Sequence, residues 1–111
     1  MLSFQRLDVY QRAIEFLALV YDIVGQLPKG NADRADQLAR AAESVVRNIA
    51  EGAGRWSEAG SSKHYKIARG EAMECAACLD VLKLRKLLAA ALYEDGIRLL
   101  EGVLAMLTKM L

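Results

Sequence analysis

Hydrophobic residues recur at three- and four-residue steps along most of the chain, which is the period of one face of an α-helix. Such stripes cover residues 7–27, 35–53, 61–88 and 97–111. A strand-like alternation is sustained nowhere, and the single proline, Pro28, follows the first stripe. The pattern therefore predicts an all-α chain of four helices.

Polar and glycine positions between the stripes mark the expected helix ends. The residue before Pro28 avoids the α conformation, so the first helix ends there. Asn31 or Asp33 can cap the second helix, and Ser57 or Ser61 the third. The short connectors predict an antiparallel up-down-up-down four-helix bundle.

Two of the predicted helices carry specific packing signals. The second helix ends in glycines that suit a left-handed cap, Gly52 and Gly54. Its predicted inward stripe, rich in small residues, is Ala35, Leu38, Ala39, Ala42, Val45, Val46, Ile49 and Ala53. The third has two apolar stripes, Tyr65, Ala68, Ala72, Cys75, Leu79 and Leu82 on one side, and Met73, Ala77, Val81, Leu84 and Leu88 on the other. A helix with two such faces predicts either a bundle interior or a subunit interface. Gly70 within it indicates a close helix crossing.

Composition limits the protein to one domain spanning residues 1–111. Hydrophobic residues make up 54% of the chain, which predicts that some apolar surface is used in subunit contacts. Fifteen Lys and Arg against fourteen Asp and Glu give a net charge of +1, which selects no class of partner. With no apolar run near the roughly 20 residues of a membrane span and no signal-peptide pattern, we expect a soluble cytoplasmic protein.

Candidate catalytic groups are sparse. The one histidine, His64, has no evident nucleophile beside it in the sequence, and the run E-G-A-G-R lacks the strand and Lys-Ser/Thr of a phosphate-binding loop. Cys75 and Cys78 form a C-A-A-C pair in mid-helix, where packing thiols are expected, although a redox or metal-binding pair is an alternative. We therefore predict a protein that is not an enzyme and uses no metal or cofactor.

The polar face of the second helix predicts an interhelical network. Gln37, Ser44, Asn48 and Glu51 follow one another at helical spacing, with Arg40 and Arg47 beside them and Glu74 on the next helix. An ion pair of Arg40 or Arg47 with Glu74 would hold the two helices in register or fix a subunit contact.

Basic residues gather after the second helix. Between Arg55 and Arg69 four Lys or Arg face one acid, and Lys83, Arg85 and Lys86 form a second cluster. These clusters are either solvated helix faces or, repeated around a ring, a multivalent phosphate-binding surface. Trp56 is expected to fold back as a lid over the core, with base stacking as the alternative.

Three motifs resemble the family of small four-helix-bundle proteins encoded in intervening sequences of bacterial 23S ribosomal RNA genes. The most specific is the run from Gln37 to Arg55, centred on N-I-A-E-G. A-R-G-x-x-x-E at residues 68–74 and the opening F-x-x-L-x-V-Y-Q-x-A at residues 4–13 also match. The resemblance spans essentially the whole chain.

The resemblance implies a ring-shaped homopentamer. It also implies kinship with the accessory protein of diversity-generating retroelements, which binds nucleic acid and a reverse transcriptase through a basic surface. The leading hypothesis is thus a non-enzymatic homo-oligomer that binds RNA, another nucleic acid or a nucleic-acid-processing partner such as a reverse transcriptase. The candidate binding residues are Arg40, Arg47, Arg55, Lys63, Lys66 and Arg69. The rival is an oligomeric protein–protein scaffold with no nucleic-acid role, whose arginines are held in salt bridges.

Overall fold

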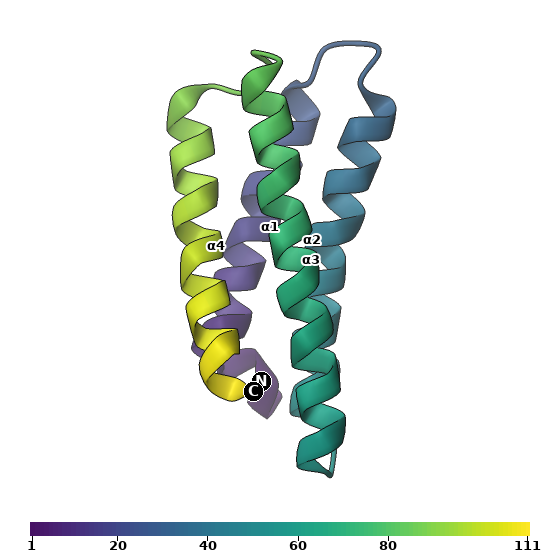
Figure 1. The fold of residues 1–111 in the computed structure, drawn as a ribbon, viewed down its shortest axis with the longest axis vertical. Helices are drawn as coiled ribbons and strands as arrows, with labels where there is room; N and C mark the ends of the chain where they lie inside the picture. Colours follow the sequence, from purple (N-terminus) through teal and green to yellow (C-terminus); the bar gives the residue numbers. More distant parts are fainter.

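The computed structural model describes all residues 1–111 as four α-helices preceded by one short 3-10 turn. The turn η1 covers Ser3–Arg6, and the helices are α1 (Asp8–Gln26), α2 (Ala32–Ala53), α3 (Glu58–Leu84) and α4 (Ala90–Met110). They run alternately up and down, and the two chain ends meet at one end of the bundle (Figure 1). Successive helices pack side by side and α1 closes the bundle against α4, while the backbones of diagonal helices stay apart and only their side chains meet in the core. The predicted antiparallel four-helix bundle is confirmed.

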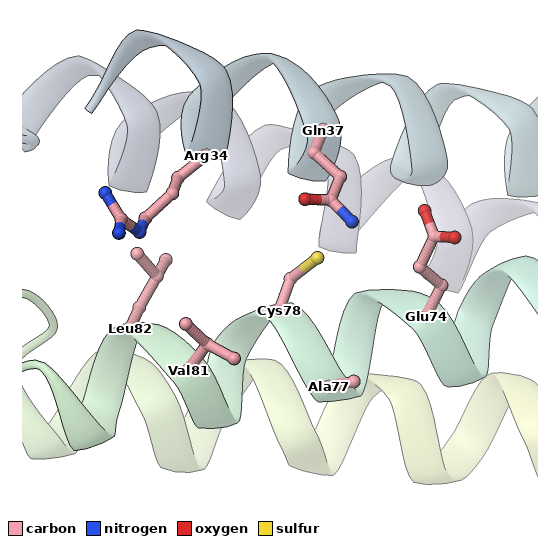
Figure 2. Close-up of a pocket in the computed structure, with 7 residues that line it drawn as sticks. All are labelled: Arg34, Gln37, Glu74, Ala77, Cys78, Val81 and Leu82. Carbon is pink, nitrogen blue, oxygen red and sulfur yellow. The ribbon is translucent and has the colours of Figure 1, made fainter.

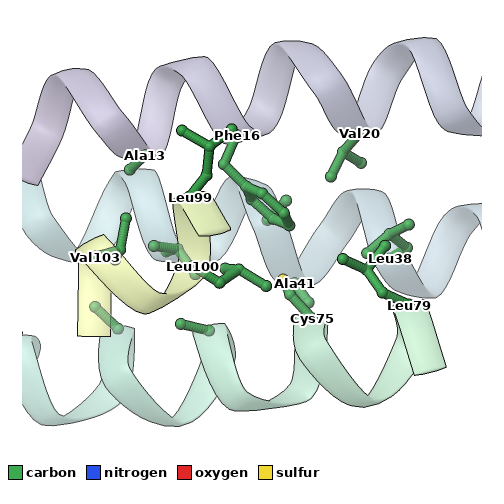
Figure 3. Close-up of a cluster of buried hydrophobic side chains, with 14 of the residues drawn as sticks. Ala13, Phe16, Val20, Leu38, Ala41, Cys75, Leu79, Leu99, Leu100 and Val103 are labelled. Carbon is green, nitrogen blue, oxygen red and sulfur yellow. The ribbon is translucent and has the colours of Figure 1, made fainter. Parts of the chain in front are cut away.

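The core is built from the predicted stripes with small changes. Phe16, Leu38, Leu79 and Leu100 are fully buried and meet along the bundle axis (Figure 3). All buried side chains are apolar or the weakly polar Tyr65 and Cys75, so hydrophobic burial stabilises the fold. On α2 the stripe is rotated from the prediction: Ala41 and Gly52 are buried, and Ala53 is exposed.

Packing against a neighbouring side chain, and not a helix cap, explains why residue 52 is a glycine. A Cβ built on Gly52 would lie 2.5 Å from Cε1 of Tyr65, so the Tyr65 ring occupies the space that any other residue would need. The glycine cap predicted for Gly52 is therefore wrong. Gly54 does occupy the C-cap position, in a right-handed conformation with φ of −88°.

Two other helix ends differ from the prediction. Helix α3 begins after Ser57, one of its two predicted caps, whose hydroxyl accepts a hydrogen bond from the Gly60 N–H at 3.0 Å, but it ends at Leu84 instead of Leu88. Helix α4 begins at Ala90, ahead of the stripe predicted to start at residue 97. Gly70 has nothing within 4 Å of its Cβ position, so the predicted close crossing is absent within one chain.

Lys86 ends α3 in a left-handed conformation, with φ of 60°. The Leu87 N–H donates to the Leu82 carbonyl at 2.9 Å across this residue, which is the hydrogen bond of a Schellman motif. A side chain at this position costs free energy that glycine avoids. The strain is confined to one exposed residue.

We expect Lys86→Gly to raise the free energy of unfolding by about 0.5–1 kcal/mol, because glycine adopts this conformation without a Cβ clash. Urea denaturation measures the change. Arg85→Gly is the control, since Arg85 has an ordinary φ of −80° and gains nothing from the substitution. A Lys86→Gly chain no more stable than the wild type would contradict the assignment of this helix end.

Candidate functional site

The outward face of α2 is a ladder of alternating charges. Arg40 Nε lies 2.9 Å from Asp36 Oδ2, and Arg55 Nη2 lies 2.9 Å from Glu51 Oε2. Arg47 Nη1 is 3.9 Å from Glu43 Oε1. All three pairs join residues four apart on the same helical face, so each acid reaches its arginine without crossing to another helix.

The predicted ion pair between Glu74 and Arg40 or Arg47 is therefore wrong. Both arginines point to solvent beside acids of their own helix, while Glu74 lies on the α3 side of the α2–α3 contact. The Glu43 carboxylate is shared, because the Tyr21 hydroxyl also donates to it at 2.6 Å. That hydrogen bond raises the pKa of Tyr21 and links α1 to α2.

The polar network between α2 and α3 is centred on Asn48. Its amide nitrogen donates to the Ser44 carbonyl at 2.9 Å and to the Ser44 hydroxyl at 3.1 Å. Its amide oxygen lies 3.0 Å from Nδ1 of His64, which must then be the donor because that oxygen can only accept. Ser44 and Asn48 of α2 and His64 of α3 thus form one hydrogen-bonded group.

His64 is a member of this network that the sequence did not reveal. The signal that could have found it is its place on α3, in the turn that faces Asn48 when α2 and α3 pack as antiparallel neighbours. Glu51 does not join the network, since it pairs with Arg55. Gln37 and Glu74 line a groove farther along the same contact and make no hydrogen bond to each other (Figure 2).

That groove encloses a cavity of about 130 Å³ between α2 and α3. Gln37 and Arg34 of α2 point across it toward α3, whose Glu74, Cys78 and Val81 form the opposite wall (Figure 2). Its volume is below the roughly 300–1,000 Å³ of ordinary small-molecule sites. A cavity of this size suits a single side chain from a neighbouring molecule.

The two cysteines are packing groups at different depths. Cys75 is buried in the core, and burial raises the pKa of its thiol to about 12. Cys78 is half-buried, and burial raises its pKa as well. Both therefore stay protonated at neutral pH, which is the opposite of the activated thiolate that redox C-x-x-C motifs require.

The second apolar stripe of α3 faces solvent. Met73 and Val81 are about half exposed, Leu84 is 83% exposed, and Ala77 lies between them. Leu88, which was expected to extend this stripe, lies beyond the end of α3 and packs against the core. Within one chain nothing covers the α3 stripe, defined here as Met73, Ala77, Val81 and Leu84, together with Gly70.

The basic residues after α2 fall into paired and unpaired sets. Lys63 and Lys66 are exposed on α3 and make no ion pair, while Arg69 donates to the Thr108 hydroxyl of α4 at 3.1 Å. Residues 55–69 carry a net charge of +3, so the rest of this chain of net charge +1 is acidic overall. The α2–α3 end of the bundle is its positive end.

The second basic cluster is partly engaged. The ammonium of Lys83 lies 4.2 Å from the centre of the Tyr93 ring, whose hydroxyl donates to Asp80 at 2.6 Å. These two contacts link α3 to α4. They also engage Lys83, one of the three cations of this cluster, in a cation–π interaction. Lys86 sits in the strained helix end.

Trp56 does not form the predicted lid. Its relative exposure is 104%, and the loop that carries it projects beyond the chain ends (Figure 1). This loop borders Met110 and Leu111 at the end of α4, yet the Trp56 side chain stays in solvent. Its position in the sequence beside a helix end gave no indication of this projection.

None of the four helices combines the length and the uniform apolarity that crossing a bilayer requires.

Comparisons with known proteins agree with this architecture. One solved structure, described as a protein of unknown function from the S23 ribosomal protein family of Bacteroides thetaiotaomicron, superimposes with a TM-score of 0.84 at 21% identity. The match covers 92% of this chain and 93% of that one, and at this identity it establishes the fold. No curated protein matches the sequence. The model of the 23S rRNA-intervening sequence protein family matches residues 5–109, and this chain therefore belongs to that family.

Proposed function

We propose that this chain is a non-enzymatic, homo-oligomeric bundle that binds RNA through the positive end formed by α2, α3 and their connection. The observation that carries the proposal is the pair of exposed, unpaired lysines, Lys63 and Lys66, within a segment of net charge +3. A chain of net charge +1 that concentrates its positive charge at one end presents a local anion-binding surface. No base-reading motif accompanies it, so contacts to the phosphate backbone supply the affinity.

Self-association is supported by the α3 stripe. Met73, Val81 and Leu84 form a contiguous exposed apolar row, and the 130 Å³ groove lies alongside it. Burying this row between copies would remove apolar surface from water at about 25 cal/mol per Å². The family resemblance suggests five copies in a ring, which would repeat the positive end five times and make binding multivalent.

The arginines contribute less to the proposed RNA affinity than the two lysines do. Arg40 and Arg47 each have an acid of α2 within 4.0 Å, and so has Arg55, which follows the end of that helix. Because an acid balances each arginine, this row of charges is neutral overall. That neutrality favours the second candidate function, an oligomeric scaffold for a protein partner. A partner such as a reverse transcriptase would then meet the ladder by complementary charge, while RNA would meet arginines that these acids already partly neutralise.

The test uses charge reversal with a matched control. We expect Lys63→Glu/Lys66→Glu to reduce affinity for a labelled 20-nucleotide RNA of mixed sequence at least 10-fold at low salt, because it removes both unpaired cations and adds repulsion. Fluorescence anisotropy measures the binding.

The control is Lys29→Glu/Arg85→Glu, which changes the net charge equally at the opposite end of the bundle (Figure 1). Equal losses in the two variants would show that only total charge matters. An absence of RNA binding by the wild type at low salt would reject the nucleic-acid function and leave the scaffold.

A further inference from the structure

Trp56 is the most exposed side chain of its size in the molecule. Its indole is 104% exposed, in the α2–α3 hairpin that projects beyond the chain ends, and its own chain leaves it uncovered (Figure 1). Tyr21, the other aromatic side chain among the exposed large apolar residues, is 47% exposed, and its hydroxyl is bonded to Glu43. A rigid aromatic ring held fully in water offers a flat face to a binding partner.

The surroundings of the ring favour an anionic partner. Trp56 borders an open hollow of about 580 Å³ whose other walls include Arg47 and Arg55. Its floor is made of small residues, Ala50 and Gly54, which leave space beside the indole. One acid, Glu51, also lines the hollow and is occupied by Arg55 at 2.9 Å.

Arg55 keeps hydrogen-bonding capacity despite this pair. A guanidinium has five N–H donors, and Glu51 accepts from one nitrogen, Nη2, leaving donors for a phosphate. Its side chain is about half exposed, so an anion can reach it. The indole ring, the two arginines and the open hollow therefore lie together at the positive end of the bundle.

We propose that a base of single-stranded nucleic acid stacks on Trp56, with the adjoining phosphates held by Arg55 and Arg47. This inference rests on the proposed RNA-binding function and names the site and the form of the ligand. A single strand is required because the faces of bases in a duplex are already stacked and cannot receive the indole. Stacking tolerates any base, so no sequence preference follows.

The chain contains one tryptophan, so its intrinsic fluorescence reports on Trp56 alone. Titration with a 12-nucleotide oligouridylate is expected to quench the emission at least two-fold. Inorganic polyphosphate of matched charge provides phosphates without bases and is expected to leave the emission nearly unchanged. Hairpin RNA with a fully paired stem and a minimal loop is expected to quench less than the single strand.

Substitution supplies an independent readout. Trp56→Ala should weaken binding of the oligouridylate by roughly 5- to 150-fold, the equivalent of about 1–3 kcal/mol for one stacked base. Trp56→Phe keeps a ring and should recover part of that loss. Because the indole makes no core contact, circular dichroism should show the same helicity and melting for all three proteins.

The outcomes separate the two proposals. Oligouridylate that binds without quenching, and binds Trp56→Ala equally well, would overturn the stacking site and leave the RNA-binding function intact. Quenching by polyphosphate equal to that by RNA would also overturn it. Emission that shifts to the blue with protein concentration alone would place Trp56 between protein molecules and overturn stacking. Absence of any binding at low salt would reject both proposals.

Discussion

Val81→Asp is expected to convert the proposed assembly of 12.2 kDa chains into monomers. Val81 is 46% exposed in the middle of the α3 stripe, so the single chain tolerates a carboxylate there. At an interface the same carboxylate would be buried without a partner, at a cost of about 3–5 kcal/mol. In a ring with head-to-tail contacts each chain contributes its stripe to one interface, so every interface meets this cost. Light scattering at micromolar concentration measures the change in mass.

The matched control is Ile14→Asp. Ile14 is also β-branched and is 40% exposed, but it lies on α1 away from the stripe. We expect this variant to keep the mass of the wild type, and both variants to keep the helical circular dichroism spectrum. A Val81→Asp protein that remains oligomeric would show that the α3 stripe is not the contact between copies.

Gly52→Ala is expected to lower the free energy of unfolding by about 1–2 kcal/mol. The new Cβ would lie 2.5 Å from Tyr65 Cε1, so the buried Tyr65 ring has to move. Overpacking of this kind costs about 1–3 kcal/mol, and the better helix propensity of alanine offsets up to about 1 kcal/mol. Urea denaturation followed by circular dichroism measures the difference.

Gly25→Ala controls for helix propensity alone. Nothing lies within 4 Å of the Cβ position of Gly25 in α1, so alanine there should raise the free energy of unfolding by about 0.5–1 kcal/mol. The two substitutions are chemically identical and have opposite expected signs. If Gly52→Ala stabilised the protein as Gly25→Ala does, the contact with Tyr65 would not explain the glycine of the N-I-A-E-G motif.

The architecture could be predicted from the sequence because it depends on periodicity. The apolar stripes gave the four helices, and Leu38, Val45 and Ile49 lie in the core as expected. Gly52 shows where periodicity stops being informative. A glycine near a helix end suggests a cap, and only the position of Tyr65 on the neighbouring helix reveals that it makes room for a ring.

The candidate site was harder to predict because charges have several possible partners. Arg40 and Arg47 could reach α3 or acids one turn away on α2, and their closeness to Asp36 and Glu43 decided between these. Trp56 was misjudged for another reason. Whether a loop residue covers the core depends on how far its hairpin extends beyond the bundle. The helical periodicity of the sequence carries no information about that distance.

The central proposal is that several copies hold one RNA strand by their positive ends. Its most direct test is the affinity of the wild-type protein for a 40-nucleotide oligouridylate, measured from about 50 to 200 mM salt. For single strands the logarithm of affinity falls with that of salt by about 0.7 per phosphate contact. Lys63, Lys66, Arg47 and Arg55 of one chain together account for a slope of about −2.8. A slope steeper than about −4 would show contacts from more than one copy, whereas a slope of about −2.8 or shallower, or no binding at 50 mM salt, would contradict the proposal.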